Sequence, residues 1–255
     1  MRQRRRRRSP LSCWGGHPRH EGAVQPMSRA VLILRPEPGN SESLARATAL
    51  GLQALSCPLF KIVPVAWEPP PCDQFDAVLL TSANALLCAG PALAQYLTLP
   101  AIAVGPSTAQ AARDAGFASV TEGAGDVADI LALGGKQSLL HLCGVDVAGV
   151  AIPSIERCAV YASDAVEIPS GFAEALSSHP IATLHSVRAA LRFTELVDMS
   201  ATPRGSISIV TISAKVADAA GKGWQEVAIA AKPRDEDVLR AALRLIQPTK
   251  AQAFS

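Results

Sequence analysis

The sequence predicts an α/β protein in which two similar parallel-sheet domains face each other across a cleft. Three observations lead to this prediction: short apolar runs alternate with Ala-rich helical segments, one strand–helix pattern occurs twice, and Ser or Thr follows the strands in both copies. Strand–helix alternation is typical of parallel sheets that carry helices on both faces. A pattern that is written twice indicates that each copy forms its own sheet.

The expected strands are short runs rich in Leu and β-branched residues: Ala30–Leu34, Leu59–Val65, Ala77–Leu80, Ala101–Val104, Ser138–Leu142, Cys158–Tyr161, Ile181–Leu184, Ile207–Val210 and Glu226–Ala230. The expected helices lie between them: Ser41–Leu55, Ser107–Ala115, Asp126–Leu133, Ser213–Ala220 and Asp235–Leu245. Ser41 is a suitable N-cap for the first helix, and Gly51 is a weak point within it.

The internal repeat pairs two strand–helix segments with two others. Asp76–Ala85 resembles Pro180–Ala189, and Ala101–Ala109 resembles Ser206–Ala214. In each copy the helix after the second strand is expected to end at a glycine. This glycine is Gly116 in the first copy and Gly221 in the second. Two Ala-rich helices can resemble each other by chance, but the shared order of strand, Ser, helix and Gly favours a true repeat.

Hydroxyl side chains stand where the predicted strands end. They are Thr81, Ser82, Ser107, Thr108, Ser186 and Ser213. Ligands of open parallel sheets bind beyond the carboxyl ends of the strands, where helix N-termini favour anions. Ser and Thr are also common N-caps, so one such residue alone would indicate little. Their presence in both copies predicts two anion-receptive surfaces facing one cleft. The second copy lacks the counterpart of Gly105, so whether Thr211 or Ser213 faces that cleft is open.

Composition predicts a folded chain with a sizeable core, because 49% of the 255 residues are hydrophobic and 18% are charged. Residues 1–26 hold seven Arg and one Glu, which leaves 24 − 7 = 17 basic and 22 − 1 = 21 acidic residues elsewhere. This acidic remainder does not favour a nucleic-acid surface. We expect the Arg-rich segment to be a disordered extension, or upstream sequence with the true start at Met27. A transit peptide or a basic tail is the alternative.

The sequence lacks a secretory signal and any apolar run of the roughly 18 residues that span a bilayer, so a cytoplasmic protein without a membrane partner is expected. Six Cys without a C-x-x-C spacing are expected to be reduced thiols, and no Cys/His cluster indicates a metal. The sequence contains no G-x-S-x-G motif, no P-loop and no dinucleotide fingerprint. We therefore expect no cofactor, and an enzyme that orients a reactive substrate.

Several segments are similar to motifs of one enzyme family. In their order and spacing they extend over about residues 30–250. They are Val31–Pro36 (VLILRP), Asp76–Ala85 with its T-S pair, Ala103–Ala109 (AVGPSTA) with Gly116, Leu139–Gly144 (LLHLCG), Cys158–Tyr161 (CAVY), and the hydroxyls of Ser186 and Ser213. In these motifs the sequence resembles bacterial uroporphyrinogen-III synthases. Each motif is weak alone, and their order and spacing make the set specific.

The resemblance implies two flavodoxin-like α/β domains joined by two extended strands. The first domain would be discontinuous, residues 27–63 plus 163–255, and the second would comprise residues 68–158. The implied substrate is hydroxymethylbilane, a linear tetrapyrrole with eight carboxylates, which the enzyme closes to uroporphyrinogen III with inversion of ring D. The resemblance further implies a monomer without a cofactor, and a possible hand-over of substrate from hydroxymethylbilane synthase.

The resemblance also suggests the site residues. Tyr161 is the expected general acid, because a phenol with an ordinary pKa of about 10 keeps its proton at neutral pH. The expected substrate-binding residues are Arg35, Thr81, Ser82, Ser107, Thr108, Gly144, Ser186 and Ser213. Arg188 and Lys215 are weaker candidates, and His185 is expected to pack rather than to act. Tyr161 could instead be a packed linker aromatic, and Arg35 a surface residue. The alternative function is a non-catalytic two-domain protein that binds an anionic small molecule.

Overall fold

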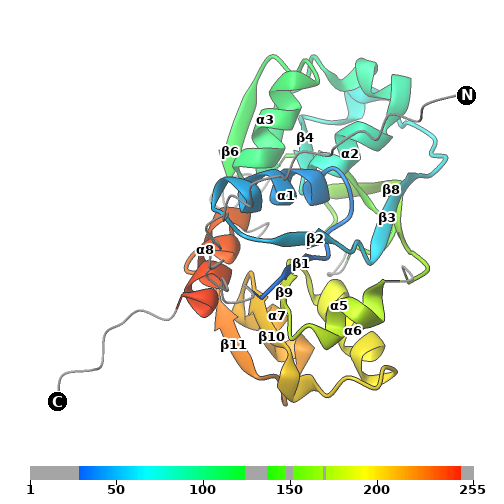
Figure 1. Cartoon of the computed structure of the whole chain (residues 1–255). Coiled ribbons are helices and arrows are strands. Elements are labelled where there is room, and N and C mark those ends of the chain that lie inside the picture. The colour runs from blue at the N-terminus through cyan, green and yellow to red at the C-terminus, as the bar shows by residue number, and fades with distance from the viewer. Residues whose placement is uncertain (1–28, 124–136, 148–151, 169–170, 248–255) are drawn as a thin grey trace, which may run out of the picture.

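The computed structural model describes residues 29–123, 137–147, 152–168 and 171–247, and it contains two separate β-sheets. The lower half of Figure 1 holds a five-stranded sheet and the upper half a six-stranded one. Strands β3 (Phe60–Pro64) and β8 (Ile155–Ala165) run between the halves and pair with each other in antiparallel fashion. The predicted class, two α/β domains joined by a pair of strands, is thereby confirmed.

All strands of the first sheet are parallel. Their order is β11-β10-β9-β1-β2, which by position in the chain is 2-1-3-4-5, the flavodoxin-like order. The strands are β1 (Val31–Ile33), β2 (Ala54–Ser56), β9 (Ile181–Leu184), β10 (Ser208–Thr211) and β11 (Glu226–Ile229). The helices are α1 (Gly39–Ala49), α5 (Phe172–Ser177), α6 (Val187–Asp198), α7 (Ala214–Ala220) and α8 (Asp235–Ile246), with a 3-10 turn η3 (Arg204–Ser206).

The second sheet has the order β3-β8-β7-β4-β5-β6, parallel except for β3. Its other strands are β4 (Ala77–Leu80), β5 (Ala101–Val104), β6 (Val120–Gly123) and β7 (Leu139–Gly144). The helical segments described here are α2 (Ala83–Cys88), α3 (Pro106–Asp114), η1 (Cys72–Gln74) and η2 (Gly90–Tyr96).

The two sheets match strand for strand once the chain is circularly permuted. The row β11-β10-β9-β1-β2 corresponds to β6-β5-β4-β7-β8, and every neighbouring pair in both rows is parallel. The repeat predicted from the sequence accounts for two strands of each row, β10 and β9 in the first and β5 and β4 in the second. Strands β11 and β6, one in each row, follow these segments in the chain. The other two strands open the chain of the first domain and close that of the second. By chain position the second domain therefore has the order 3-2-1-4-5 rather than the flavodoxin-like one.

The first sheet is buried on both faces. Val31 and Ile33 pack with Ala47 of α1 and Val238 of α8, whereas Leu32 and Leu34 lie in the cluster on the opposite face. That second cluster is formed by α5, α6 and α7, and it includes Phe193 and Trp224, whose stacked rings are 5.6 Å apart. Burial on both sides explains why β1 reads as an unbroken apolar run.

The bounds Ser41–Leu55 expected for the first helix are wrong at both ends. Helix α1 spans Gly39–Ala49 with Pro38 at the N-cap, and the hydroxyl of Ser41 donates to Glu37 instead of capping. Gly51 adopts a left-handed φ of 74°, which ends the helix and turns the chain into β2. Strands β2 and β6 were not expected. The predicted helix Asp126–Leu133 and the Arg-rich segment lie outside the described residues.

No helix in the described ranges is both long and apolar enough to cross a membrane.

Candidate functional site

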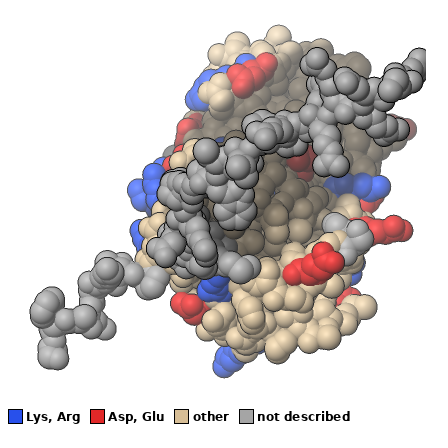
Figure 2. Space-filling view, in the orientation of Figure 1, with Lys and Arg blue, Asp and Glu red and all other residues tan. Residues whose placement is uncertain are grey.

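The carboxyl edges of the two sheets meet at an ion pair. Arg188 lies in the first turn of α6, just beyond the end of β9, and its guanidinium pairs with Asp146, two residues beyond the end of β7. The same guanidinium lies 4.7 Å from the ring centroid of Phe60 on β3. Figure 2 shows a hollow between the two lobes, walled mostly by uncharged residues. Ligand sites of parallel sheets form at such edges, so this hollow is the candidate cleft.

Tyr161 lies where β8 changes partners. In register it pairs with Gly144 of β7 on one side and with Pro64 of β3 on the other. The Val145 N–H donates to the carbonyl of Tyr161 at 2.9 Å. A Cβ atom placed on Gly144 would lie 2.9 Å from both Cε2 and Cζ of the Tyr161 ring. The phenol ring therefore lies directly against the Gly144 backbone, and only glycine leaves room for it there.

The phenol of Tyr161 stays protonated at neutral pH. Burial raises the pKa of Tyr161, and a hydrogen bond with Ser82 partly opposes that rise. Ser82 is the N-cap of α2, and its Oγ also accepts from the Asn84 N–H at 3.2 Å. The structure thus brings Tyr161, Ser82 and Gly144, three of the predicted site residues, into one group. A protonated, half-buried phenol can donate a proton or a hydrogen bond.

Thr81, which precedes Ser82, contacts a buried histidine that the sequence analysis did not assign to the site. Its Oγ1 lies 3.0 Å from Nε2 of His141 on β7. Burial, with the positive charge of Arg157, lowers the pKa of His141 from 6.5 to about 4. His141 is therefore neutral at physiological pH and shares one hydrogen bond with Thr81. This pair orients the Thr81 side chain.

Ser107 and Thr108 occupy the first turn of α3, whose N-cap is Gly105 and whose start has no side-chain cap. Ser107 is exposed, whereas Thr108 is buried. The first-turn N–H groups of a helix without a side-chain cap suit an anion.

The equivalent positions of the first domain differ from one another. Ser186 is the N-cap of α6, and its Oγ accepts from the Ala189 N–H at 3.1 Å. Ser213 is the N-cap of α7 without a side-chain bond. Thr211 is fully buried, and its hydroxyl donates to the Ser213 carbonyl at 3.1 Å. Ser213 is thus the more accessible of the two, and Lys215 beyond it is exposed.

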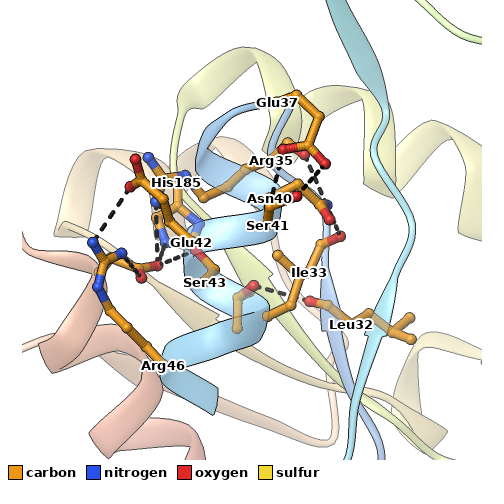
Figure 3. Close-up of polar contacts among 12 residues, drawn as sticks. Leu32, Ile33, Arg35, Glu37, Asn40, Ser41, Glu42, Ser43, Arg46 and His185 are labelled. Atoms are coloured by element: carbon orange, nitrogen blue, oxygen red, sulfur yellow. Dashed lines mark hydrogen bonds and ion pairs between the residues drawn. The ribbon is translucent and has the colours of Figure 1, made fainter. Parts of the chain in front are cut away.

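Arg35 belongs to a separate polar cluster around Asp235, the first residue of α8. Figure 3 shows Arg35 in this cluster beside Ser43 and His185. Its Nη1 donates to Ser43 Oγ at 3.1 Å and lies 3.4 Å from Asp235 Oδ1. His185 also contacts this carboxylate, with Nε2 at 2.8 Å from Oδ1. The contact between His185 and Asp235 was not predicted from the sequence.

In the described residues, no group of His, Cys, Asp and Glu side chains is arranged to hold a metal ion. The five cysteines in these ranges are free thiols, of which Cys57 and Cys143 are buried.

The family model of uroporphyrinogen-III synthase HemD matches residues 41–240, which is 240 − 40 = 200 of the 255 residues. The chain belongs to the uroporphyrinogen-III synthase family. This family consists of lyases of tetrapyrrole biosynthesis, so the chain is an enzyme of that class.

Solved structures of uroporphyrinogen-III synthases have the same fold. The enzyme of Helicobacter pylori matches with a TM-score of 0.59 at 21% identity, over 86% of this chain and 100% of that one. A mutant of the Thermus thermophilus enzyme matches with a TM-score of 0.50 at 18% identity, over 86% and 99% of the two chains. No curated protein sequence matches significantly.

Five of the nine predicted site residues fall into two groups, and Ser107, Thr108, Ser186 and Ser213 stand at separate helix starts. Tyr161, Gly144, Ser82 and Thr81 lie together in the second domain, and Arg35 lies in the Asp235 cluster of the first. Arg188 and Asp146 join the two edges. Sequence reasoning missed Asp146, Asp235 and His141. The only signal for Asp235 was an acidic residue at a helix start beyond a predicted strand.

Proposed function

We propose that this chain closes hydroxymethylbilane to uroporphyrinogen III in the cleft between its two domains, with Tyr161 as the proton donor. The observation that carries this proposal is the protonated phenol held between Ser82 and the Gly144 backbone, at the point where the linker strand leaves the second domain. The cleft would lie between a first domain of residues 27–63 plus 163–255 and a second of residues 68–158.

The chemical role of Tyr161 is to help the terminal hydroxyl of the substrate leave. The phenol proton passes to the hydroxyl oxygen as the carbon–oxygen bond breaks, and water departs. The electron pair of the ring A nitrogen then forms the azafulvene. The substituted carbon of ring D attacks it to give a spiro intermediate. The bond between that carbon and the methylene bridge to ring C then breaks, and the free α-carbon of ring D bonds to this bridge, so that ring D is inverted. The proton lost on aromatisation restores the phenol.

The second task is to hold a flexible polyanion in one curled conformation. Without a catalyst the linear substrate closes to the uninverted isomer I, so the enzyme must favour attack by one carbon over another. Hydroxyls and helix-start N–H groups on both edges suit the carboxylates. We assign this role to Thr81, Ser82, Ser107, Thr108, Ser186 and Ser213, together with Arg35 and the backbone of Gly144.

The test is an isomer analysis. The full chain is incubated with enzymatically made hydroxymethylbilane, the products are oxidised to porphyrins, and the ratio of isomers is measured against a protein-free control. We expect isomer III to dominate in proportion to enzyme concentration. If isomer I forms at the protein-free rate, or more slowly, the chain is the alternative, a binding protein for an anionic small molecule.

We further propose that the protein acts in the cytoplasm as a monomer and receives its substrate from hydroxymethylbilane synthase. The instability of the linear substrate favours a short path between the two enzymes. Adding the upstream enzyme in stoichiometric amounts should lower the isomer I background more than the same amount of an unrelated protein does.

A further inference from the structure

The carboxylate of Asp235 ties together three separate segments of the first domain. Its Oδ1 accepts from Ser43 Oγ at 2.7 Å and from His185 Nε2 at 2.8 Å, and its Oδ2 accepts from Arg46 Nη1 at 2.8 Å. Arg35 approaches Oδ1 to 3.4 Å. The side chain of Asp235 is only 10% exposed, so these contacts replace most of its hydration. Figure 3 shows Ser43 and Arg46 on α1, with Arg35 and His185 beside them.

The charge state of this cluster follows from its contacts. Hydrogen bonds from His185, Ser43 and Arg46 hold the pKa of Asp235 well below its usual range, although burial acts the other way. Burial lowers the pKa of His185. The ring nitrogen Nδ1 of His185 is buried and makes no hydrogen bond of normal geometry among the described residues. Asp235 and the backbone of Thr183 oppose the effect of burial on the pKa of His185 without outweighing it. The neutral ring donates from Nε2 to the ionised carboxylate.

The guanidinium of Arg35 is fixed at one end and unpaired at the other. Nη1 contacts Ser43 and Asp235, whereas Nε and Nη2 have no acceptor within the described part of the chain. The group lies flat on Gly39, where an added Cβ would be 2.6 Å from Nη2. Arg46 differs, because Asp235 and Glu42 occupy both of its terminal nitrogens. Arg35 lies two residues beyond the end of β1, so its unpaired donors lie near the carboxyl edge of the sheet.

We propose that Asp235 is a positioning residue that, with His185 and Ser43, holds Arg35 so that Nε and Nη2 bind a carboxylate of the substrate. This inference rests on the proposed function, which supplies the polycarboxylate. The paired donors of a guanidinium match a carboxylate in two-point geometry. Fixing the guanidinium beforehand lowers the ordering cost of binding. Asp235 does not touch the substrate in this arrangement.

The kinetic test uses the full-length Asp235→Asn variant. We expect KM for hydroxymethylbilane to rise about tenfold while kcat stays within about twofold, because the lost interaction concerns binding. In an Arg35→Gln background, Asp235→Asn should add little to KM, since both changes remove one interaction. Asp198→Asn, which breaks the exposed pair with Arg204, is the matched control and should leave KM unchanged. Equal KM increases in both backgrounds would overturn the proposal.

A spectroscopic test separates this inference from the proposed function. The guanidinium nitrogen signals of Arg35, identified by their loss in Arg35→Gln, should show slow rotation in the wild-type chain and fast rotation in Asp235→Asn. Unchanged rotation would refute the positioning role of Asp235, whichever product the enzyme forms. Failure to form isomer III would refute only the proposed synthase function. Should Asp235→Asn not fold, His185→Gln serves instead, with an expected KM rise of about threefold; an unchanged KM and rotation in that variant would refute the proposal.

Discussion

Arg188 and Asp146 form an ion pair that joins the carboxyl edge of one sheet to that of the other. Both side chains are about half exposed, at 45% and 56%. An exposed pair of this kind contributes little to the free energy of unfolding, about 0–1 kcal/mol. Its position matters more than its strength, because the pair links the two sheet edges at the candidate cleft.

We predict that Arg188→Gln loosens the arrangement of the two domains without destabilising either. The distance distribution from small-angle scattering should broaden, while the free energy of unfolding changes by less than about 1 kcal/mol. Glu195→Gln, which breaks an ion pair within α6, is the control and should leave the scattering unchanged. Identical scattering for wild type and Arg188→Gln would show that the pair does not set the domain spacing.

We predict that Gly144→Ala displaces Tyr161. The new Cβ would lie 2.9 Å from the phenol ring, so the ring or the strand must shift. Such overpacking costs about 1–3 kcal/mol of stability, and turnover should fall because the phenol moves. Urea unfolding and initial rates measure the two effects. Gly205→Ala, where the nearest atom is 3.8 Å from the new Cβ, should change neither. Wild-type turnover in Gly144→Ala would show that activity does not depend on the space that Gly144 leaves for Tyr161.

The sequence predicts the fold well where strands are buried on both faces. The bounds expected for β4, β5 and β9 agree with the structure, and those for β10 are shifted by one residue. Of these strands β4, β9 and β10 are buried along their whole length, and β5 is partly exposed. Strands β2 and β6 escaped prediction because both are short and partly exposed. The circular permutation of the two domains leaves no local signal, since it concerns which strands become neighbours.

The candidate site is predictable only in part, for a related reason. Hydroxyls that follow strands can be found by inspection, and Ser82 and Ser186 are N-caps as their positions suggested. The importance of Asp235 depends on α1 and β9 bringing Ser43 and His185 to it, over 192 and 50 residues of chain. No spacing rule encodes such an approach, so the role of this carboxylate emerges only with the tertiary structure.

We predict that His141 makes the protein less stable as the pH falls from about 6.5 to 4. Its pKa is lowered from 6.5 to about 4 in the folded state, so in this range the unfolded chain binds a proton that the folded chain does not. The loss is on the order of 3 kcal/mol when complete. Urea unfolding of His141→Gln should show a shallower slope of stability against pH. Some slope should remain, because the pKa of His185 is lowered too. An unchanged slope in His141→Gln would show that His141 does not cause the loss of stability at low pH.

We predict that Thr108→Val weakens activity without weakening the fold. Helix α3 begins at Gly105 without a side-chain cap, so the start of the helix should survive the change. A hydrogen bond from the hydroxyl to a substrate carboxylate is worth about 1.5–3 kcal/mol, and kcat/KM should fall accordingly. Ser107→Ala tests the exposed neighbour in the same way. A fall in stability of about 1 kcal/mol with unchanged turnover by the folded protein would make Thr108 a structural residue.

We predict that Tyr161→Phe slows turnover by about a hundredfold, the low end for a positioned general acid. Phe keeps the ring against Gly144, so substrate binding should change little. Isomer III should remain the enzymatic product, because the shape of the cleft rather than this proton selects the attacking carbon. Single-turnover rate and isomer ratio are measured together, with correction for spontaneous isomer I.

The control for this prediction is Tyr96→Phe, which changes the other tyrosine. The hydroxyl of Tyr96 donates to the Pro70 carbonyl at 2.6 Å, so this variant should lose stability but keep its turnover rate. A wild-type rate in Tyr161→Phe would make this residue a packed linker aromatic, and normal substrate loss with mostly isomer I would make it a conformational guide instead of an acid.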